Sequence, residues 1–157
     1  MRVWRLAKEA YRLPTGEGAL KYGGRWNPPG FAIVYTSESV ALAALETLVH
    51  ADSDLLPDDL IVLKGEIPST LPLHTISVND LPPNWHEIPG SPALHQIAVD
   101  WLRANQTVAL RVPSAIVAQE HNVLLNPAHP DFSRIHWETV GPFHWDPRLG
   151  QFPKNLS

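Results

Sequence analysis

The sequence contains no cysteine among its 157 residues. This excludes disulfide bonds, cysteine nucleophiles and zinc sites built on thiolates, and it fits a reducing compartment. The sequence also lacks an excess of basic residues, because 12 Lys and Arg face 16 Asp and Glu, for a formal net charge of −4. Proteins that bind nucleic acids usually carry a basic surface, so we expect no direct contact with DNA or RNA.

No long hydrophobic run is present either. The most apolar stretches, residues 33–35 and 40–45, are far shorter than the roughly 18 residues that a membrane-spanning helix needs. Residues 1–9 carry charges where a secretory signal would need an apolar run. We therefore expect a cytoplasmic protein with no membrane partner.

What the sequence does contain is apolar material divided into short pieces. Hydrophobic residues make up 44% of the chain and include six tryptophans, which is enough to form a core. The 16 prolines are about twice the usual share, and they interrupt any long regular element. This composition favours one compact domain over residues 1–157 and excludes a long helical bundle.

Local patterns predict two helices among several short strands. The helix over 40–50 has apolar residues at helical spacing and a cap at Ser37 or Ser39, and the helix over 92–104 opens with Ser91-Pro92 and ends at Asn105. We expect a glycine-rich loop between residues 14 and 30. Strands are expected at 3–6, 32–36, 60–67, 75–78, 107–112, 123–125, 135–140 and 143–145, with one more near Ile116. The predicted fold class is α+β.

Searches for common catalytic motifs return little. The chain has no phosphate-binding P-loop, no dinucleotide fingerprint, no nucleophile elbow and no pair of histidines at metal-ligand spacing. His121, His129 and Asp131 could meet only through the fold. We therefore expect no metal site, and we assign the histidines to the surface or to hydrogen bonds.

Three residues remain as candidates, each with a plain structural alternative. Arg25 follows two glycines in a loop, where it could present its guanidinium to a phosphate or form an ordinary salt bridge. Glu46 lies at the edge of the apolar arc of its helix, so it either points into a cleft or is solvated. Ser114 follows a strand end, where serine is more often a turn residue than a catalytic one.

In combination and order, these segments resemble the RES domain, a family named for an Arg, a Glu and a Ser. The matching segments span nearly the whole chain. They are GGRWNP at 23–28, YTS at 35–37, ALA at 41–43, LE at 45–46, LVH at 48–50, VPS at 112–114, NVLLNP at 122–127 and HP at 129–130.

The resemblance implies a fold similar to ADP-ribosyltransferases and a role as the toxin of a bacterial toxin–antitoxin pair. The implied partners are an Xre-type helix-turn-helix antitoxin and a second copy of the chain in a homodimer. The implied activity is depletion of NAD⁺ by cleavage of its nicotinamide–ribose bond, by hydrolysis or phosphorolysis, with NAD⁺ as substrate and no cofactor. The implied site residues are Glu46, Arg25 and Ser114 as catalytic groups, with Arg5, Tyr35, Asn122 and Asn126 binding substrate.

These residue types suit that chemistry. A carboxylate such as Glu46 can accept a hydrogen bond from a ribose hydroxyl as positive charge develops on the sugar. Arg25 and Arg5 suit the pyrophosphate, Tyr35 could stack on nicotinamide, and Ser114 could donate to the ribose or the pyrophosphate.

Two other functions remain open. The chain could transfer ADP-ribose to a protein, or it could be a non-catalytic domain that binds a nucleotide or a protein. Position 44, two residues before Glu46, is alanine, whereas many transferases that modify proteins carry a second acid there. This favours cleavage of free NAD⁺ over protein modification, and the full set of Arg, Tyr, Glu and Ser argues against a binding-only role.

Overall fold

A computed structural model of the chain describes residues 1–51, 56–88 and 90–150. It contains a seven-stranded sheet with few helices, as the predicted α+β class requires. The strands are β1 (Arg2–Lys8), β2 (Val34–Ser37), β3 (Leu60–Glu66), β4 (Leu73–Thr75), β5 (Ala109–Pro113), β6 (His121–Leu125) and β7 (His136–Pro142). The α-helices are α1 (Glu17–Tyr22), α2 (Val40–His50) and α3 (Pro92–Ala104). Four 3₁₀ turns cover Glu9–Tyr11, Val78–Asp80, Pro130–Arg134 and Pro147–Gly150.

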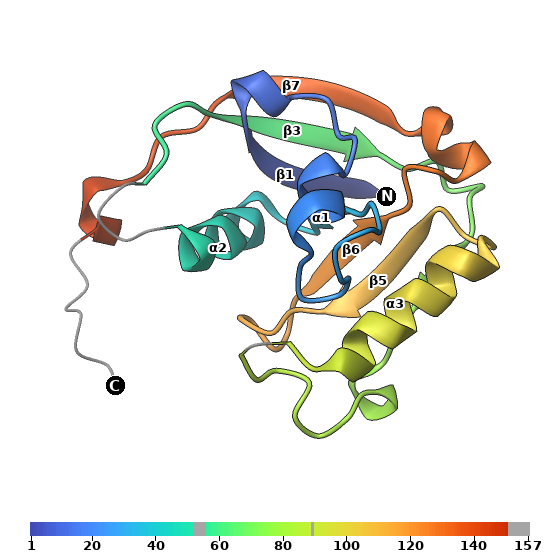
Figure 1. The fold of residues 1–157 in the computed structure, drawn as a ribbon. Coiled ribbons are helices and arrows are strands. Elements are labelled where there is room, and N and C mark those ends of the chain that lie inside the picture. Colours follow the sequence, from blue (N-terminus) through green and yellow to red (C-terminus); the bar gives the residue numbers. More distant parts are fainter. Residues whose placement is uncertain (52–55, 89, 151–157) are drawn as a thin grey trace.

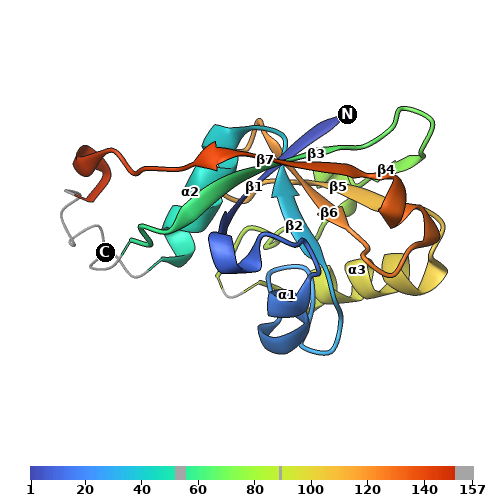
Figure 2. The same ribbon diagram turned by 90° about the horizontal axis from the view of Figure 1, so that it is seen from above.

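The sheet has the order β4-β5-β6-β2-β1-β3-β7, and its pairs are antiparallel except for β4 with β5. Its middle is loosely joined. β1 pairs with β3 along its whole length, whereas a single residue pair, Trp4 with Ser37, joins β1 to β2. In Figure 1 the β1, β3 and β7 strands accordingly lie apart from β5 and β6, and Figure 2 shows the strands crossing one another in a strongly twisted sheet.

Helix α3 covers the β5–β6 half of the sheet. Leu94, Ala98 and Trp101 on α3 pack with Leu110 of β5 and Leu124 of β6. Ser91 caps the helix by accepting a hydrogen bond from the Ala93 N–H, and Pro92 occupies the first turn, as predicted. This packing holds the ends of β5 and β6 in place beside α2.

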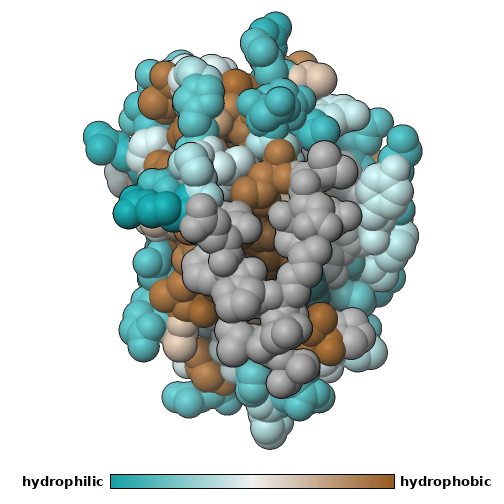
Figure 3. All heavy atoms as spheres, turned by 90° about the vertical axis from the view of Figure 1, so that its left-hand side faces the viewer, coloured by the Kyte–Doolittle hydropathy of each residue, from teal (hydrophilic) through white to brown (hydrophobic). Residues whose placement is uncertain are grey.

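Helix α2 has a narrow buried face. Only Leu42 and Ala43 are buried, and Ala43 packs against Leu6 of β1 and Leu60 of β3. Leu45 and Val49 stay exposed, and apolar and polar side chains are interspersed on the surface at the α2 side of the molecule (Figure 3). Because the helix sits shallowly on the sheet, its remaining face is available to a cavity.

Several predicted elements need correction. A short helix, α1, replaces part of the expected glycine-rich loop, and the predicted strand at 75–78 ends at Thr75. There Ser77 and Asp80 form a capping box that starts a 3₁₀ turn instead. The region near Ile116 forms a bend and residues 143–145 form no strand, although the Phe143 N–H still donates to the Leu60 carbonyl.

Within the described ranges, no helix is both long enough and apolar enough to cross a bilayer.

Candidate active site

A cavity of about 380 Å³ lies where β1 and β2 separate. β1, the 23–26 loop, β2, α2 and the neighbouring ends of β5 and β6 all contribute to its wall. Five of the predicted site residues line it: Arg5, Arg25, Tyr35, Glu46 and Asn122. These residues are spread over more than a hundred positions of sequence, and the fold brings them to one place.

The carboxylate of Glu46 is held through one of its two oxygens. Oε1 accepts a hydrogen bond from Asn122 Nδ2 at 2.5 Å and another from Ser114 Oγ at 3.2 Å. Oε2 has no hydrogen-bond or ion-pair partner among the residues that the structure describes. Glu46 is half-buried in the cavity wall, so the solvated alternative weighed from the sequence does not apply.

Ser114 supports Glu46 from behind the cavity wall. Its side chain belongs to a residue that is only 1% exposed, and its Oγ accepts hydrogen bonds from the N–H groups of Ile116 and Val117. With its one proton donated to Glu46, the hydroxyl has no free donor for a substrate. The structure therefore shows Ser114 in contact with Glu46, and its predicted contact with the ribose or the pyrophosphate stays a prediction.

Asn122 is likewise engaged with protein groups. Its Oδ1 accepts a hydrogen bond from Ser37 Oγ at 2.7 Å, and its Nδ2 binds Glu46. Ser37 is 3% exposed and is the direct partner of Asn122 across β2 and β6. The sequence interpretation assigned no site role to Ser37, and its position next to Tyr35 in the YTS segment was the only available signal.

Arg5 bridges the gap between β1 and β2. Its Nη1 donates to the Tyr35 carbonyl at 3.1 Å, where the two strands lack regular pairing. Burial lowers the pKa of the Arg5 guanidinium, which stays protonated, and its buried Nε has no hydrogen-bond partner among the described residues. Arg5 lines the cavity and pairs with no carboxylate among those residues, so the cavity is suited to an anion such as a phosphate.

Arg25 is anchored through one of its guanidinium nitrogens, Nη1. Its Nη1 donates to the carbonyls of Trp85 and Glu87, both at 3.0 Å. No carboxylate pairs with Arg25 among the described residues. The salt-bridge alternative therefore does not hold here, and Nε and Nη2 are not used by these two bonds.

Tyr35 lines the cavity, and its hydroxyl is fixed by the loop that carries Arg25. The hydroxyl donates to Asn27 Oδ1 at 2.7 Å and accepts from the Trp26 N–H at 3.1 Å. Burial raises the pKa of the Tyr35 hydroxyl well above its ordinary value, so it stays protonated. Fully buried Asn27, which the sequence interpretation also missed, binds the carbonyls of Ala19, Pro28 and Phe31 and so holds the whole loop around Arg25.

Asn126 does not belong to the cavity, which corrects its predicted role in binding substrate. It lies just beyond the opposite end of β6 from Asn122, and four residues of strand span about 13 Å. Its side chain donates to Asn105 Oδ1 and accepts from the Ala128 N–H, both at 3.0 Å. Asn105 ends α3 in a left-handed conformation, so this pair joins the end of α3 to the chain after β6.

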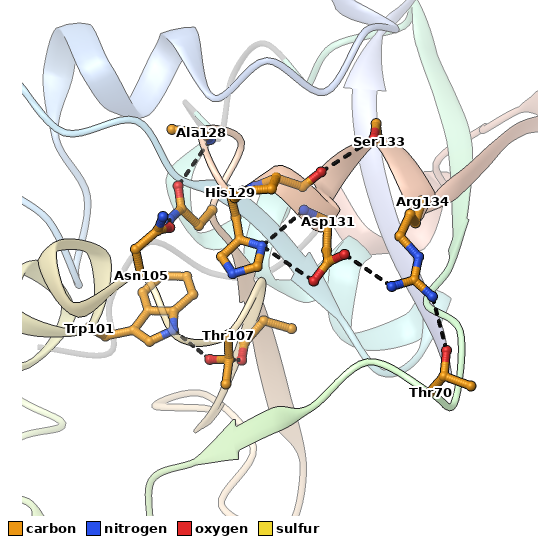
Figure 4. Close-up of polar contacts among 12 residues, drawn as sticks. Thr70, Trp101, Asn105, Thr107, Ala128, His129, Asp131, Ser133 and Arg134 are labelled. Atoms are coloured by element: carbon orange, nitrogen blue, oxygen red, sulfur yellow. Dashed lines mark hydrogen bonds and ion pairs between the residues drawn. The ribbon is translucent and has the colours of Figure 1, made fainter.

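Of the three residues considered as a metal group, His129 and Asp131 lie next to each other, whereas His121 lies at the start of β6. His129 accepts a hydrogen bond from the Asp131 N–H, and Asp131 pairs with Arg134 at 3.0 Å (Figure 4). His121 instead accepts from Arg111 on β5 at 2.9 Å. Within the described parts of the chain, no three His, Asp or Glu side chains gather as they would around a metal ion.

Comparison with known proteins decides the family. The model of the RES domain matches residues 2–146. The chain belongs to the RES-domain family. A "Prs ADP-ribosylating toxin" of Sphingobium sp. (strain YBL2) is 38% identical over 93% of this chain and 94% of its own length. "Toxin Res" of Yersinia enterocolitica is 37% identical over 95% of this chain and 99% of its own length.

A solved structure confirms the fold of this RES domain. The crystal structure of the Mycobacterium tuberculosis MbcT–MbcA toxin–antitoxin complex contains a chain that superposes with a TM-score of 0.71. The match covers 96% of this chain and 86% of the other, at 16% sequence identity. The predicted membership of a toxin family is confirmed by these relatives, and the fold class is confirmed by the structure.

Proposed function

We propose that this RES-domain toxin cleaves the nicotinamide–ribose bond of NAD⁺. The observation that carries the proposal is the Glu46 carboxylate, held through Oε1 with Oε2 unpaired, in the same cavity as Arg5 and Arg25. One acid and two cations are what this reaction needs, because the substrate carries a negative pyrophosphate and develops positive charge on its ribose.

The proposed chemistry starts at the nicotinamide, which is already a cationic pyridinium in NAD⁺. When the glycosidic bond breaks, its electron pair goes to the ring nitrogen and neutral nicotinamide leaves, so no strong general acid is required. Positive charge then develops on the ribose, and Glu46 Oε2 stabilises it by accepting a hydrogen bond from a ribose hydroxyl. Water then adds to the ribose carbon that lost nicotinamide and gives ADP-ribose and a proton, whereas inorganic phosphate would add to the same carbon and give ADP-ribose phosphorylated there.

The two arginines bind rather than react. Arg25 Nε and Nη2 supply donors for pyrophosphate oxygens, and the Arg5 guanidinium adds a positive charge to the same cavity wall. The Tyr35 ring supplies an apolar surface on which nicotinamide can stack, while its fixed hydroxyl takes no part in proton transfer.

The direct test incubates the purified protein with NAD⁺, with and without phosphate, and identifies the products by chromatography and mass spectrometry. We expect free nicotinamide in both reactions. ADP-ribose as the partner product indicates hydrolysis, and a phosphorylated sugar that appears only with phosphate indicates phosphorolysis. Intact NAD⁺ after prolonged incubation with folded protein would contradict the proposal.

Transfer of ADP-ribose to a protein is a second candidate, favoured by the name of the Sphingobium relative. Against it stands Ala44, which packs against the cluster of Leu6, Ala43 and Leu60 and leaves no second acid two positions before Glu46. NAD⁺ labelled in its adenylate half separates the two in a bacterial extract. Label on a protein band supports transfer, and label on free ADP-ribose supports cleavage.

We also propose that a helix-turn-helix antitoxin of Xre type neutralises this chain and carries any contact with DNA. The structural neighbour is part of a toxin–antitoxin complex, and this chain has a net charge of −4 without a basic excess. Expression of the chain alone should arrest growth and lower cellular NAD⁺, and co-expression of the antitoxin should reverse both effects. Tight DNA binding by the isolated chain would contradict this division of roles. A homodimer stays a prediction, which light scattering of the purified chain tests.

A further inference from the structure

We propose that Ser37 and Asn122 are positioning residues that act through Glu46. They hold Oε1 of the carboxylate against the protein so that Oε2 is the oxygen presented to the reacting sugar. The inference rests on the proposed cleavage of NAD⁺ and adds a residue, Ser37, that the sequence interpretation left without a role. It also moves Asn122 from binding substrate to orienting the acid.

The hydrogen bonds run in one direction from Ser37 to Glu46. Ser37 Oγ donates to Asn122 Oδ1 at 2.7 Å, and Asn122 Nδ2 donates to Glu46 Oε1 at 2.5 Å. A carboxylate accepts hydrogen bonds and cannot donate them, so it requires the amide N–H₂ and repels the amide oxygen. The hydroxyl of Ser37 then satisfies the oxygen that points away from Glu46.

The sheet places these residues with little freedom. Ser37 and Asn122 are direct partners on β2 and β6, so their side chains project from the same face at neighbouring positions. Ser39, two residues later, caps α2 by accepting from the Leu42 N–H, and it also donates to Glu120 Oε2 at 2.9 Å. The helix that carries Glu46 is therefore tied to the same strand ends that carry Ser37 and Asn122.

The reverse face of these strand ends is braced as well. Arg111 on β5 donates from Nε and Nη2 to the two oxygens of Glu38, and from Nη2 to His121 Nδ1. Glu38 follows Ser37 directly, and His121 precedes Asn122. The relative placement of Ser37 and Asn122 is thus fixed from both faces of the sheet.

Two bonds on one carboxylate oxygen restrict a side chain that otherwise rotates freely on a helix surface. Such restriction matters for a group that must meet charge in the transition state, because small displacements of a catalytic group strongly lower its effect. Since neither Ser37 nor Asn122 needs to touch the substrate, their loss should lower kcat and leave KM nearly unchanged.

Kinetics of four variants test the inference, with Thr107→Val as the control for loss of a hydroxyl. Thr107 Oγ1 accepts from Trp101 Nε1 at 2.9 Å and donates to the Ala109 carbonyl at 3.1 Å, and Thr107 is not among the residues that line the cavity. Ser37→Ala and Asn122→Ala should lower kcat on the order of tenfold or more with KM within about twofold of wild type. Thr107→Val should lower the thermal unfolding temperature and keep kcat per folded molecule.

Asn122→Asp gives a readout that a purely structural role would not produce. It places a second carboxylate within hydrogen-bond distance of Glu46, and two such groups share a proton. The acidic limb of the pH–rate profile should therefore move upward by about one pH unit or more, and activity should return in part at higher pH. An unshifted profile would count against direct contact between residue 122 and Glu46.

The outcomes separate this inference from the proposed function. Wild-type protein that leaves NAD⁺ intact contradicts the proposed cleavage of NAD⁺. The positioning of Glu46 by Ser37 and Asn122 is then tested by NMR, through the ¹³C carboxyl resonance of Glu46. That resonance is assigned by its absence from the spectrum of Glu46→Gln. That resonance should shift in Ser37→Ala and not in Thr107→Val. If wild type cleaves NAD⁺ and Ser37→Ala matches it in kcat, the positioning role of Ser37 is wrong. A raised KM at unchanged kcat in Asn122→Ala would return Asn122 to the role of binding substrate.

Discussion

The side-chain amide of Asn122 donates to the carboxylate of Glu46 at 2.5 Å, although the two residues are 76 positions apart in the chain. The contact joins the start of β6 to the middle of α2, and it lies in the wall of the cavity that also contains Arg5 and Arg25. The acid is therefore fixed by the sheet rather than by its own helix. This arrangement determines which substitutions should affect turnover and which should affect binding or stability.

Replacement of Glu46 by Gln should abolish most activity with little effect on the fold. The change keeps the size of the side chain and removes its negative charge, so stabilisation of the developing ribose cation is lost. We expect turnover to fall on the order of a hundredfold or more, with NAD⁺ affinity nearly unchanged. Single-turnover rates and dissociation constants for both proteins measure this. Near wild-type cleavage by Glu46→Gln would remove Glu46 from the mechanism.

Arg25→Ala should weaken binding of NAD⁺ in addition to any effect on rate, because the pyrophosphate is charged before and during the reaction. Loss of a bidentate phosphate contact should raise the dissociation constant about tenfold or more. The measurement uses Glu46→Gln as background, so that the ligand survives the titration. The same change releases the carbonyls of Trp85 and Glu87, so proteolysis near residues 85–88 should accelerate. Unchanged affinity would show that Arg25 serves only to hold that loop.

Gly24→Ala should destabilise the fold through Tyr35. A Cβ on Gly24 would lie 2.7 Å from the Tyr35 hydroxyl oxygen, which is itself bonded to Asn27. We expect a loss of about 1–3 kcal/mol in the free energy of unfolding, measured by chemical denaturation. Gly18→Ala is the control, since nothing lies within 4 Å of its Cβ and alanine favours helix α1. Equal stability of the two variants would contradict the close approach at Gly24.

Acid should weaken the fold partly through His121. Burial first and the Arg111 guanidinium second lower the pKa of His121 below its ordinary value, against an opposing effect of Glu38. The folded state therefore keeps His121 neutral and accepting from Arg111, while the unfolded chain takes up a proton more readily. The 3.8 Å approach to Glu38 is for the same reason not an ion pair at neutral pH.

The sign of the effect follows from this lowered pKa. The contribution of His121 to stability is complete above the ordinary histidine pKa of about 6.5, and it is lost as pH falls through the lower pKa of the folded state. Unfolding free energies measured between pH 7 and pH 5 should decline less steeply in His121→Gln than in wild type. Identical slopes would mean that His121 titrates alike in the folded and unfolded chain.

An element could be predicted from the sequence where the residues that stabilise it lie within or directly beside it. Helices α2 and α3 carry their own caps, Ser39 and Ser91, and both helices were predicted at their observed positions, with Ser37 as the alternative cap of α2. Helix α1 was missed because its support comes from outside. It is flanked by Gly16 and Gly23, which both have a positive φ, and Asn27 donates to the Ala19 carbonyl. Its six residues are too few for a helical periodicity of apolar side chains to be recognised.

Among the site residues, some could be identified from the sequence and others only from the fold. Residue type and the family resemblance identified Glu46 and Arg25, but the roles of Ser37 and Ser114 follow from the register of β2 with β6 and from the turn after β5. Asn122 and Asn126 have the same parity along β6, so an alternating pattern assigns them to one face. Only the length of the strand separates them, since the cavity lies at one of its two ends.

The single residue pair between β1 and β2 has a consequence for how the domain opens. We expect the sheet to open at the boundary between β1 and β2, because a single residue pair joins these strands there. The amide hydrogens of β1, β3 and β7 should then exchange independently of those of β5 and β6. A ligand that contacts both Arg5 on β1 and Tyr35 on β2 spans that boundary. Occupancy of the cavity would then slow amide exchange in strands as remote as β7 and β5. The two groups of strands would open together, and their amide hydrogens would be protected to the same extent.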